Sequence, residues 1–225
     1  MPAGLSVDEV EAVYDRIGRA QDTQAFYEEP ALEALLRHGA FEDAASVVEI
    51  GCGTGRFAHR LLAQHLADTA TYRAVDLSAT MTAIARERLQ PFGERAVVRK
   101  TDGRLPVDLP DASVDRVVSA YVLDLLSDAG IRTVLDDAHR LLRPHGRLCL
   151  AGLTTGETAL SHLTTRIWTT VHRLQPAWVG GCRPVRIREH LDDSRWEMLH
   201  HQVVSAWSVP SEVLVARPVE PSAAC

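Results

Sequence analysis

The stretch that most constrains this chain is Val-Val-Glu-Ile-Gly-Cys-Gly-Thr-Gly at residues 47–55. A short apolar run ends beside an acidic residue, and glycines then alternate with other residues. A helix is expected directly afterwards, because apolar side chains recur about every 3.6 residues at Phe57, Leu61, Leu62 and Leu66. Glycines let a ligand approach the main chain, and a helix N-terminus adds unpaired amide donors. The pattern therefore predicts the cradle of a nucleotide-like cofactor, with a tight turn alone as the structural alternative.

The position of the last glycine indicates which of two classes of cofactor the loop binds. A dinucleotide fingerprint reads G-x-G-x-x-G or A, and its last small residue packs the helix against the strand. Here Arg56 occupies that position, and the glycine falls one residue earlier. The resulting string, E-x-G-x-G-x-G, resembles motif I of the class I S-adenosylmethionine-dependent methyltransferases. The resemblance implies a loop that binds S-adenosylmethionine and leaves S-adenosylhomocysteine as product, built from Glu49, Gly51, Cys52, Gly53 and Gly55. Glu49 is expected to order this loop through its amides.

A second strand is expected at residues 71–78, and it contains Asp76. This aspartate follows Gly55 by about 20 positions, where an acid binds a ribose diol in doubly wound α/β folds. The plainer alternative is that Asp76 caps the next helix, although Ser78 can also serve as that cap. The string Asp-Leu-Ser followed by Met resembles the acidic-loop motif of the same family. The resemblance implies that Leu77 and Met81 also lie at the cofactor.

The next two strands carry further parts of the resemblance. A third strand, at residues 96–100, leads into Asp102 and Gly103. In the family, an acid at this place accepts a hydrogen bond from the adenine amino group, but Asp-Gly is also an ordinary turn pair. A fourth strand is expected to end near Ser119, whose side chain the resemblance places at the methionine end of the cofactor. The junction Leu-Leu-Arg-Pro-His-Gly-Arg-Leu at 141–148 resembles small-molecule methyltransferases of the quinone-biosynthesis type.

The flanking segments are expected to form lids and the edge of the sheet. A capping box at residues 6–9 opens a first helix, and Pro30 opens a second one. Behind a fifth strand at 147–153, an expected helix carries Trp168, and aromatic residues there can steer a flat or apolar acceptor. A short helix and two antiparallel strands joined through Val209-Pro210 complete the chain, at residues 187–191, 196–207 and 211–215.

These elements predict an α/β fold, namely a Rossmann-like, doubly wound, mostly parallel seven-stranded sheet with an antiparallel final strand. The whole chain, 1–225, is expected to form a single domain. Its predicted parts are an N-terminal helical lid, a cofactor-binding core, a substrate lid, the last two strands and a tail, at residues 1–43, 44–153, 154–192, 193–217 and 218–225.

The composition limits which substrates and which cellular compartment are expected. A net charge of −6 and the absence of a Lys/Arg run argue against nucleic acid as a substrate. No apolar stretch reaches the roughly 18–20 residues of a membrane span, and the first residues do not read as a secretory signal. Cytoplasmic localisation is the expectation. The cysteines show no metal-ligand spacing, so no metal is expected; they stand at Cys52, Cys149, Cys182 and Cys225.

The function that the resemblance implies is methyl transfer to a small-molecule acceptor by direct in-line displacement. A general base is needed only for a hydroxyl or a protonated amine. The sequence offers Tyr14, Tyr121, His172 and Asp124 as weak candidates, each of which can equally be a structural residue. The alternatives are an NAD(P)-dependent oxidoreductase, which Arg56 disfavours, and a methyltransferase-like binding module without catalysis. No feature of the sequence indicates an oligomeric state.

Overall fold

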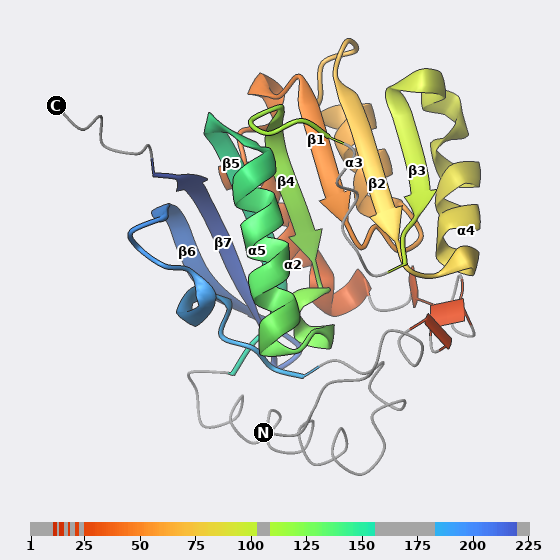
Figure 1. Ribbon diagram of the computed structural model, residues 1–225. Coiled ribbons are helices and arrows are strands. Elements are labelled where there is room, and N and C mark those ends of the chain that lie inside the picture. Colours follow the sequence, from red (N-terminus) through yellow and green to blue (C-terminus); the bar gives the residue numbers. More distant parts are fainter. Residues whose placement is uncertain are drawn as a thin grey trace, which may run out of the picture.

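The computed structural model describes residues 11, 12, 14, 15, 18, 21, 22, 25–102, 109–155 and 183–219. Within these residues the chain forms one sheet with helices on both faces (Figure 1). The expected capping box at residues 6–9 and the expected helix with Trp168 and His172 lie outside the described residues, as do Gly103, Cys182 and Cys225.

The sheet has seven strands in the order β3-β2-β1-β4-β5-β7-β6. They are β1 (Ser46–Ile50), β2 (Thr71–Asp76), β3 (Ala96–Lys100), β4 (Val114–Ala120), β5 (Leu142–Leu153), β6 (Trp196–Ala206) and β7 (Val209–Pro218). The strands from β1 to β5 pair in parallel, and β7 is antiparallel to both β5 and β6. The predicted Rossmann-like fold class, including its antiparallel final strand, is confirmed.

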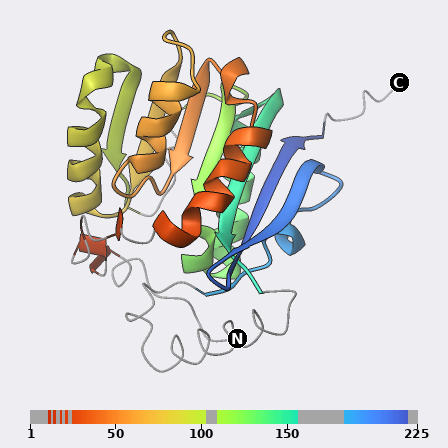
Figure 2. The ribbon, with the colours of Figure 1, turned by 180° about the vertical axis from the view of Figure 1, so that it is seen from behind.

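The helices divide between the two faces of the sheet. One face packs against α2 (Ala25–His38), α3 (Arg56–Gln64) and α4 (Ala79–Leu89). The other packs against α5 (Asp128–Leu141) and the 3₁₀ helix η6 (Ile187–His190). In Figure 1, α5 lies in front of the sheet, whereas Figure 2 shows α2 and α3 from the opposite side. The described residues also form the 3₁₀ helices η2 (Phe41–Asp43), η3 (Gln90–Arg95) and η4 (Leu123–Leu125).

Helices α4 and α5 each begin at a serine that caps the helix, and α3 buries the apolar stripe that its spacing predicts. Ser78 Oγ accepts a hydrogen bond from Met81 N at 3.0 Å at the start of α4. Ser127 Oγ accepts one from Gly130 N at 3.2 Å at the start of α5, so each serine satisfies an otherwise unpaired amide. The apolar stripe after the glycine-rich loop is buried as expected, and each fully buried side chain contributes roughly 1.5–3 kcal/mol to folding.

Two expected boundaries are wrong. Pro30 does not open a helix but lies inside α2, which begins at Ala25. Proline removes one helix hydrogen bond, here at an exposed position near the helix start, where water can replace it. The fifth strand begins at Leu142 rather than Arg147, because Leu142 pairs with Val114 ahead of a register irregularity.

The turn between the last two strands also differs from the expected one. It consists of Trp207 and Ser208, with φ of 53° and 65°, rather than Val209-Pro210. Positive φ at both central residues matches the twist of the two strands in a two-residue hairpin. Pro210 instead lies within β7, opposite Ser205.

The order of the strands reverses between β1 and β4, which are neighbours in the sheet. The chain leaves β1 toward β2 on one side and leaves β4 toward β5 on the other. Connections that diverge in this way leave a crevice at the carboxyl ends of the strands, where ligands bind in open α/β sheets. The arrowheads of β1, β2 and β4 in Figure 1 point to this edge.

Candidate cofactor-binding site

A cavity of about 210 Å³ lies at this crevice. Its walls come from the glycine-rich loop after β1, the end of β2, the end of β4 and the first turns of α5. Most of the wall is apolar, through Ile50, Val75, Leu77, Val122, Leu125, Leu126 and Val134. A concave apolar site with a few polar groups is the usual form of a small-molecule or cofactor site.

The main chain of the glycine-rich loop forms one wall of the cavity. Gly51 and Gly53 line it, and both have left-handed backbones, with φ of 74° and 51°. A Cβ on Gly51 would lie 2.2 Å from Val122 Cγ2, and a Cβ on Gly53 would lie 3.3 Å from Gln21 Oε1. The amide of Gly51 donates to the carbonyl of Val75 at 2.8 Å, which ties the loop to β2. The backbone therefore favours glycine at both positions, and at Gly51 the available space requires it as well.

The carboxylate of Asp76 organises the meeting of this loop with α4. Its Oδ2 accepts a hydrogen bond from Gly53 N at 2.8 Å, and its Oδ1 accepts one from Ser78 N at 2.9 Å. Burial raises the pKa of Asp76, and the backbone hydrogen bonds oppose that shift. A carboxylate has about four acceptor positions, so acceptor capacity is left on a side chain that lines the cavity. Adjacent hydroxyl donors, such as those of a ribose, fit this arrangement.

Glu49 lies beneath the loop and does not line the cavity. Its side chain is buried, and its Oε2 accepts a hydrogen bond from the hydroxyl of Tyr72 at 2.9 Å. Burial raises the pKa of Glu49 to about 8, the bond from Tyr72 lowers it, and the nearby charge of Asp76 raises it. The hydrogen bond between Tyr72 and Glu49 therefore links the side chains of β2 and β1 beneath the loop. Tyr72 gave no signal in the sequence, because nothing in its spacing links it to Glu49.

Three further expected cofactor residues are buried and do not line the cavity. Cys52 packs in the core behind the loop, where burial raises the pKa of its thiol. Met81 is fully buried at the start of α4. Ser119 donates a hydrogen bond to the carbonyl of Ile50 at 3.2 Å, which joins β4 to β1.

Gly55 and Asp102 also lie away from the cavity wall. Gly55, with φ of 74°, precedes α3, and a Cβ there would lie 3.0 Å from the Cβ of Ala85. Its small size is thus required by the approach of α4 to the loop. Asp102 is exposed and follows Thr101, which does line the cavity.

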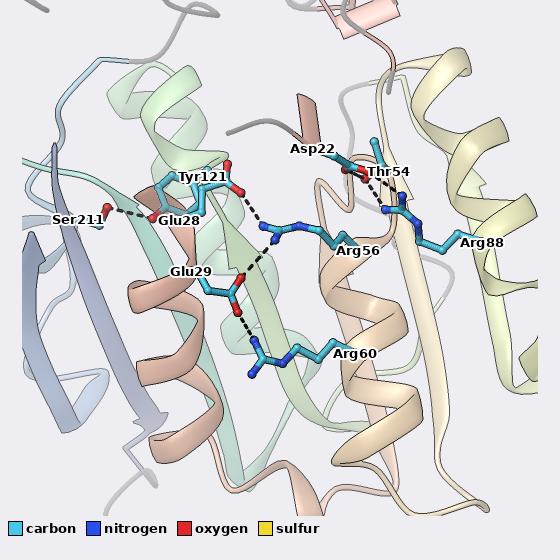
Figure 3. Close-up of polar contacts among 9 residues, drawn as sticks. All are labelled: Asp22, Glu28, Glu29, Thr54, Arg56, Arg60, Arg88, Tyr121 and Ser211. Carbon is cyan, nitrogen blue, oxygen red and sulfur yellow. Dashed lines mark hydrogen bonds and ion pairs between the residues drawn. The ribbon is translucent and has the colours of Figure 1, made fainter. Parts of the chain in front are cut away.

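Of the expected catalytic candidates among the described residues, Tyr14 and Tyr121 line the cavity and Asp124 does not. The hydroxyl of Tyr121 donates to Ser211 Oγ in β7 at 2.9 Å (Figure 3). Burial raises the pKa of Tyr121, and this hydrogen bond lowers it. Asp124 Oδ2 accepts a hydrogen bond from Leu153 N at 3.4 Å. The Tyr121 hydroxyl is therefore engaged with the sheet.

Sequence reasoning missed the apolar wall formed by Val122, Leu125 and Leu126. A signal was present, because these residues follow β4 as Gly51 follows β1, and parallel neighbours end at the same edge. It also missed Gln21, which lines the cavity from the N-terminal segment. No motif marks Gln21, since only the folded chain brings it to Gly53.

The fold and the cavity define an α/β domain with a cofactor-type site at its switch point. Residues 47–146 match the family described as a methyltransferase domain. The malonyl-[acyl-carrier protein] O-methyltransferase of Erwinia pyrifoliae is 30% identical over 161 residues, which cover 69% of this chain and 55% of that protein. The crystal structure of the [4+2]-cyclase SpnF has a TM-score of 0.71 at 17% identity, covering 96% of this chain and 97% of that one. For a geranyl diphosphate methyltransferase in complex with GPP and sinefungin, the TM-score is 0.65 at 14% identity, covering 85% and 78%.

Over residues 47–146 this chain is therefore similar to a methyltransferase domain, and several of the curated relatives that it matches are methyltransferases. It spans about half the length, or less, of the curated relatives it matches. The solved structures are similar in fold alone, and the cyclase among them shows that one fold hosts different reactions. The comparisons give no support to an oxidoreductase. In the described ranges, no helix is both long and apolar enough to cross a membrane.

Proposed function

We propose that this chain binds S-adenosylmethionine in the cavity and transfers its methyl group to a small-molecule acceptor by direct in-line displacement. The observation that carries the proposal is the main-chain wall at Gly51 and Gly53 beside the carboxylate of Asp76. The similarity of residues 47–146 to a methyltransferase domain supports the choice of cofactor. A bare main chain, a carboxylate with free acceptor positions and an apolar slot match the three parts of S-adenosylmethionine, namely its polar methionine tail, its ribose and its adenine base.

Each part of the cofactor has a proposed set of residues. Asp76 would bind the ribose hydroxyls, and Leu77 would lie beside them. The apolar side chains of Val122 and Leu125 would pack on the flat base. Asp102 and Gly103 stay predicted for the adenine amino group. Glu49, Cys52, Gly55, Met81 and Ser119 are proposed to support the loop from behind rather than touch the cofactor.

The cofactor supplies a methyl group on a sulfonium, which is already a good leaving group. The part left to the protein is to hold the acceptor in line and to exclude water, and positioning of this kind can contribute about 7–11 kcal/mol. The hydroxyl of Tyr121 is bonded to Ser211 rather than directed at a reacting atom. We therefore assign Tyr121 to the wall of the site and place no general base on it.

The proposed acceptor is a small molecule that needs no deprotonation. The net charge of −6 disfavours a nucleic acid. A relative of this chain is a malonyl-[acyl-carrier protein] O-methyltransferase. A carboxylate oxygen is ionised near neutral pH and requires no base, in keeping with the engaged Tyr121 hydroxyl. Carboxylate-bearing small molecules and malonyl thioesters are thus the first acceptors to test.

The test is calorimetric titration of the purified chain with S-adenosylmethionine, S-adenosylhomocysteine and NADH. A micromolar dissociation constant, about −8 kcal/mol, for the first two and none for NADH would support the proposal. Transfer of a labelled methyl group to an acceptor from the panel would then identify the reaction. Binding of NADH, or no binding of S-adenosylmethionine, would overturn it. Binding without transfer to any acceptor would favour a non-catalytic module.

A further inference from the structure

Asp22, Thr54 and Arg88 form a closed set of polar contacts outside the cavity, which we name the 22–54–88 triangle (Figure 3). Arg88, in α4, donates from Nη1 to Thr54 Oγ1 at 2.7 Å and from Nη2 to Asp22 Oδ2 at 2.6 Å. The hydroxyl of Thr54 donates to Asp22 Oδ1 at 2.5 Å. Three segments distant in the sequence therefore meet at one point.

The triangle is partly shielded from water. Thr54 is 4% exposed, and the side chains of Arg88 and Asp22 are 22% and 32% exposed. Burial raises the pKa of Asp22, but the hydrogen bonds from Arg88 and Thr54 outweigh it and lower that pKa. Charge-assisted hydrogen bonds between partly buried groups are stronger than those of exposed ion pairs, which contribute little to stability.

The position of Thr54 gives the triangle a link to the cavity. Thr54 stands between Gly53 and Gly55, both of which hold left-handed backbones. Its side chain is fixed from outside by the triangle, while the amide of Gly53 is fixed from inside by Asp76. Asp22 also follows Gln21, the residue whose side-chain oxygen lies nearest to a Cβ built on Gly53.

We propose that Asp22 and Arg88 are positioning residues for the cofactor, acting through Thr54 on the glycine-rich loop. They hold the loop in the conformation that exposes its main chain to the cavity, and they hold Gln21 beside it. Neither Asp22 nor Arg88 lines the cavity, so their effect on binding passes through Thr54 and Gln21. The inference rests on the proposed function, because it takes S-adenosylmethionine as the ligand of the loop.

The experiment compares the affinity for S-adenosylmethionine and S-adenosylhomocysteine, by calorimetry, in the wild type and in Asp22→Asn, Arg88→Met and their double variant. Each single change should weaken the binding of both ligands about tenfold, since a charge-assisted bond is lost. The double variant should bind no more weakly than the worse single variant, because the triangle acts as a unit. Thr54→Val should match Asp22→Asn, and Thr54→Ser should recover most of the loss, because only the hydroxyl matters.

Two controls separate loop positioning from general stabilisation. Arg195→Met breaks an exposed pair with Asp136 and should leave the affinity unchanged. Arg95→Met removes the bonds to the carbonyls of Ala67 and Ala70 and the pair with Asp68, none of which lines the cavity or contacts Thr54, and should weaken binding less than twofold. A loss in Arg95→Met as large as that in Asp22→Asn would overturn the positioning role of the triangle.

The outcomes distinguish the inference from the proposed function. Wild-type affinity in the Asp22, Arg88 and Thr54→Val variants would overturn the positioning role alone. A wild type that binds neither ligand would overturn the proposed function and the inference together. Should Asp22→Asn fail to fold, the comparison of Thr54→Val with Thr54→Ser decides, since both keep every charge of the triangle.

Discussion

The two halves of the sheet's carboxyl edge treat their polar groups differently. On the β1–β2 side, the carboxylate of Asp76 holds two loop amides and still lines the cavity with acceptor positions to spare. On the β5–β7 side, buried polar groups satisfy one another. Tyr121 donates to Ser211, and Glu212 accepts hydrogen bonds from Ile187 N at 2.6 Å and from His201. The first half leaves acceptor positions open toward the cavity, whereas these groups of the second half bond to one another within the protein.

The largest expected loss of stability comes from a substitution in the main-chain wall of the cavity at Gly51. Gly51→Ala adds a methyl 2.2 Å from Val122 Cγ2 at a φ of 74°, so overpacking of about 1–3 kcal/mol adds to backbone strain of about 1–2 kcal/mol. We expect a loss near 3 kcal/mol in the free energy of unfolding, measured by urea denaturation. Gly18→Ala is the control, because Gly18 also has a positive φ, 49°, and the nearest atom to its added Cβ is Thr80 Cγ2 at 3.7 Å, an ordinary van der Waals contact. Equal losses would show that the contact with Val122 is not tight.

The next effect compares one polar residue from each half. Asp76→Ala should weaken the binding of S-adenosylmethionine about 100-fold. Hydrogen bonds to a charged group are worth about 1.5–3 kcal/mol each, and the variant also loses the bond from the amide of Gly53. Ser211→Ala should change the dissociation constant less than about twofold, since Ser211 bonds only within the second half. Calorimetry on both variants measures the difference. A comparable loss in Ser211→Ala would place the ligand against β7 and erase the contrast.

A third effect concerns the buried carboxyl beneath the loop. The pKa of Glu49 is about 8, whereas a glutamate in the unfolded chain titrates near 4.3. Between these values the folded state holds a proton that the unfolded state has released, so stability falls as the pH rises through this window. The contribution is roughly 1.4 kcal/mol for each unit of pKa difference. Stability contributed by neutral Glu49 is thus largest near pH 4 and lost by about pH 8.

The matched variant is Glu49→Gln, which keeps the shape and cannot ionise. Urea denaturation at pH 5, 6.5 and 8.5 should show the variant gaining on the wild type as the pH rises. Tyr72→Phe should extend the fall in stability to higher pH, because the bond from Tyr72 lowers the pKa of Glu49 and its loss would raise that pKa further. Parallel curves for the wild type and Glu49→Gln would mean that Glu49 is ionised in the folded state throughout.

The same contrast explains which parts the sequence could predict. The strands, Gly51 and Asp76 follow from local patterns, because a loop between a strand and a helix is encoded by contiguous residues. The bond between Tyr121 and Ser211 joins residues 90 positions apart, and no periodicity relates them. The turn at Trp207 was misplaced because its positive φ has no glycine to announce it. Side chains that complete a site from distant segments, such as Asp22, emerge only from tertiary packing.

The smallest expected effect tests whether Tyr121 belongs to the wall. Tyr121→Phe keeps the ring and removes the bond to Ser211 Oγ, which is buried, so we expect a loss of about 1 kcal/mol in the free energy of unfolding. Ser211→Ala should cost a similar amount, and the double variant should cost less than the sum of the two, since one bond is shared. Methyl transfer at saturating cofactor should change less than about threefold. A general base would contribute about 100-fold or more, so a loss of that size would return Tyr121 to catalysis and make the second half of the edge part of the reacting site.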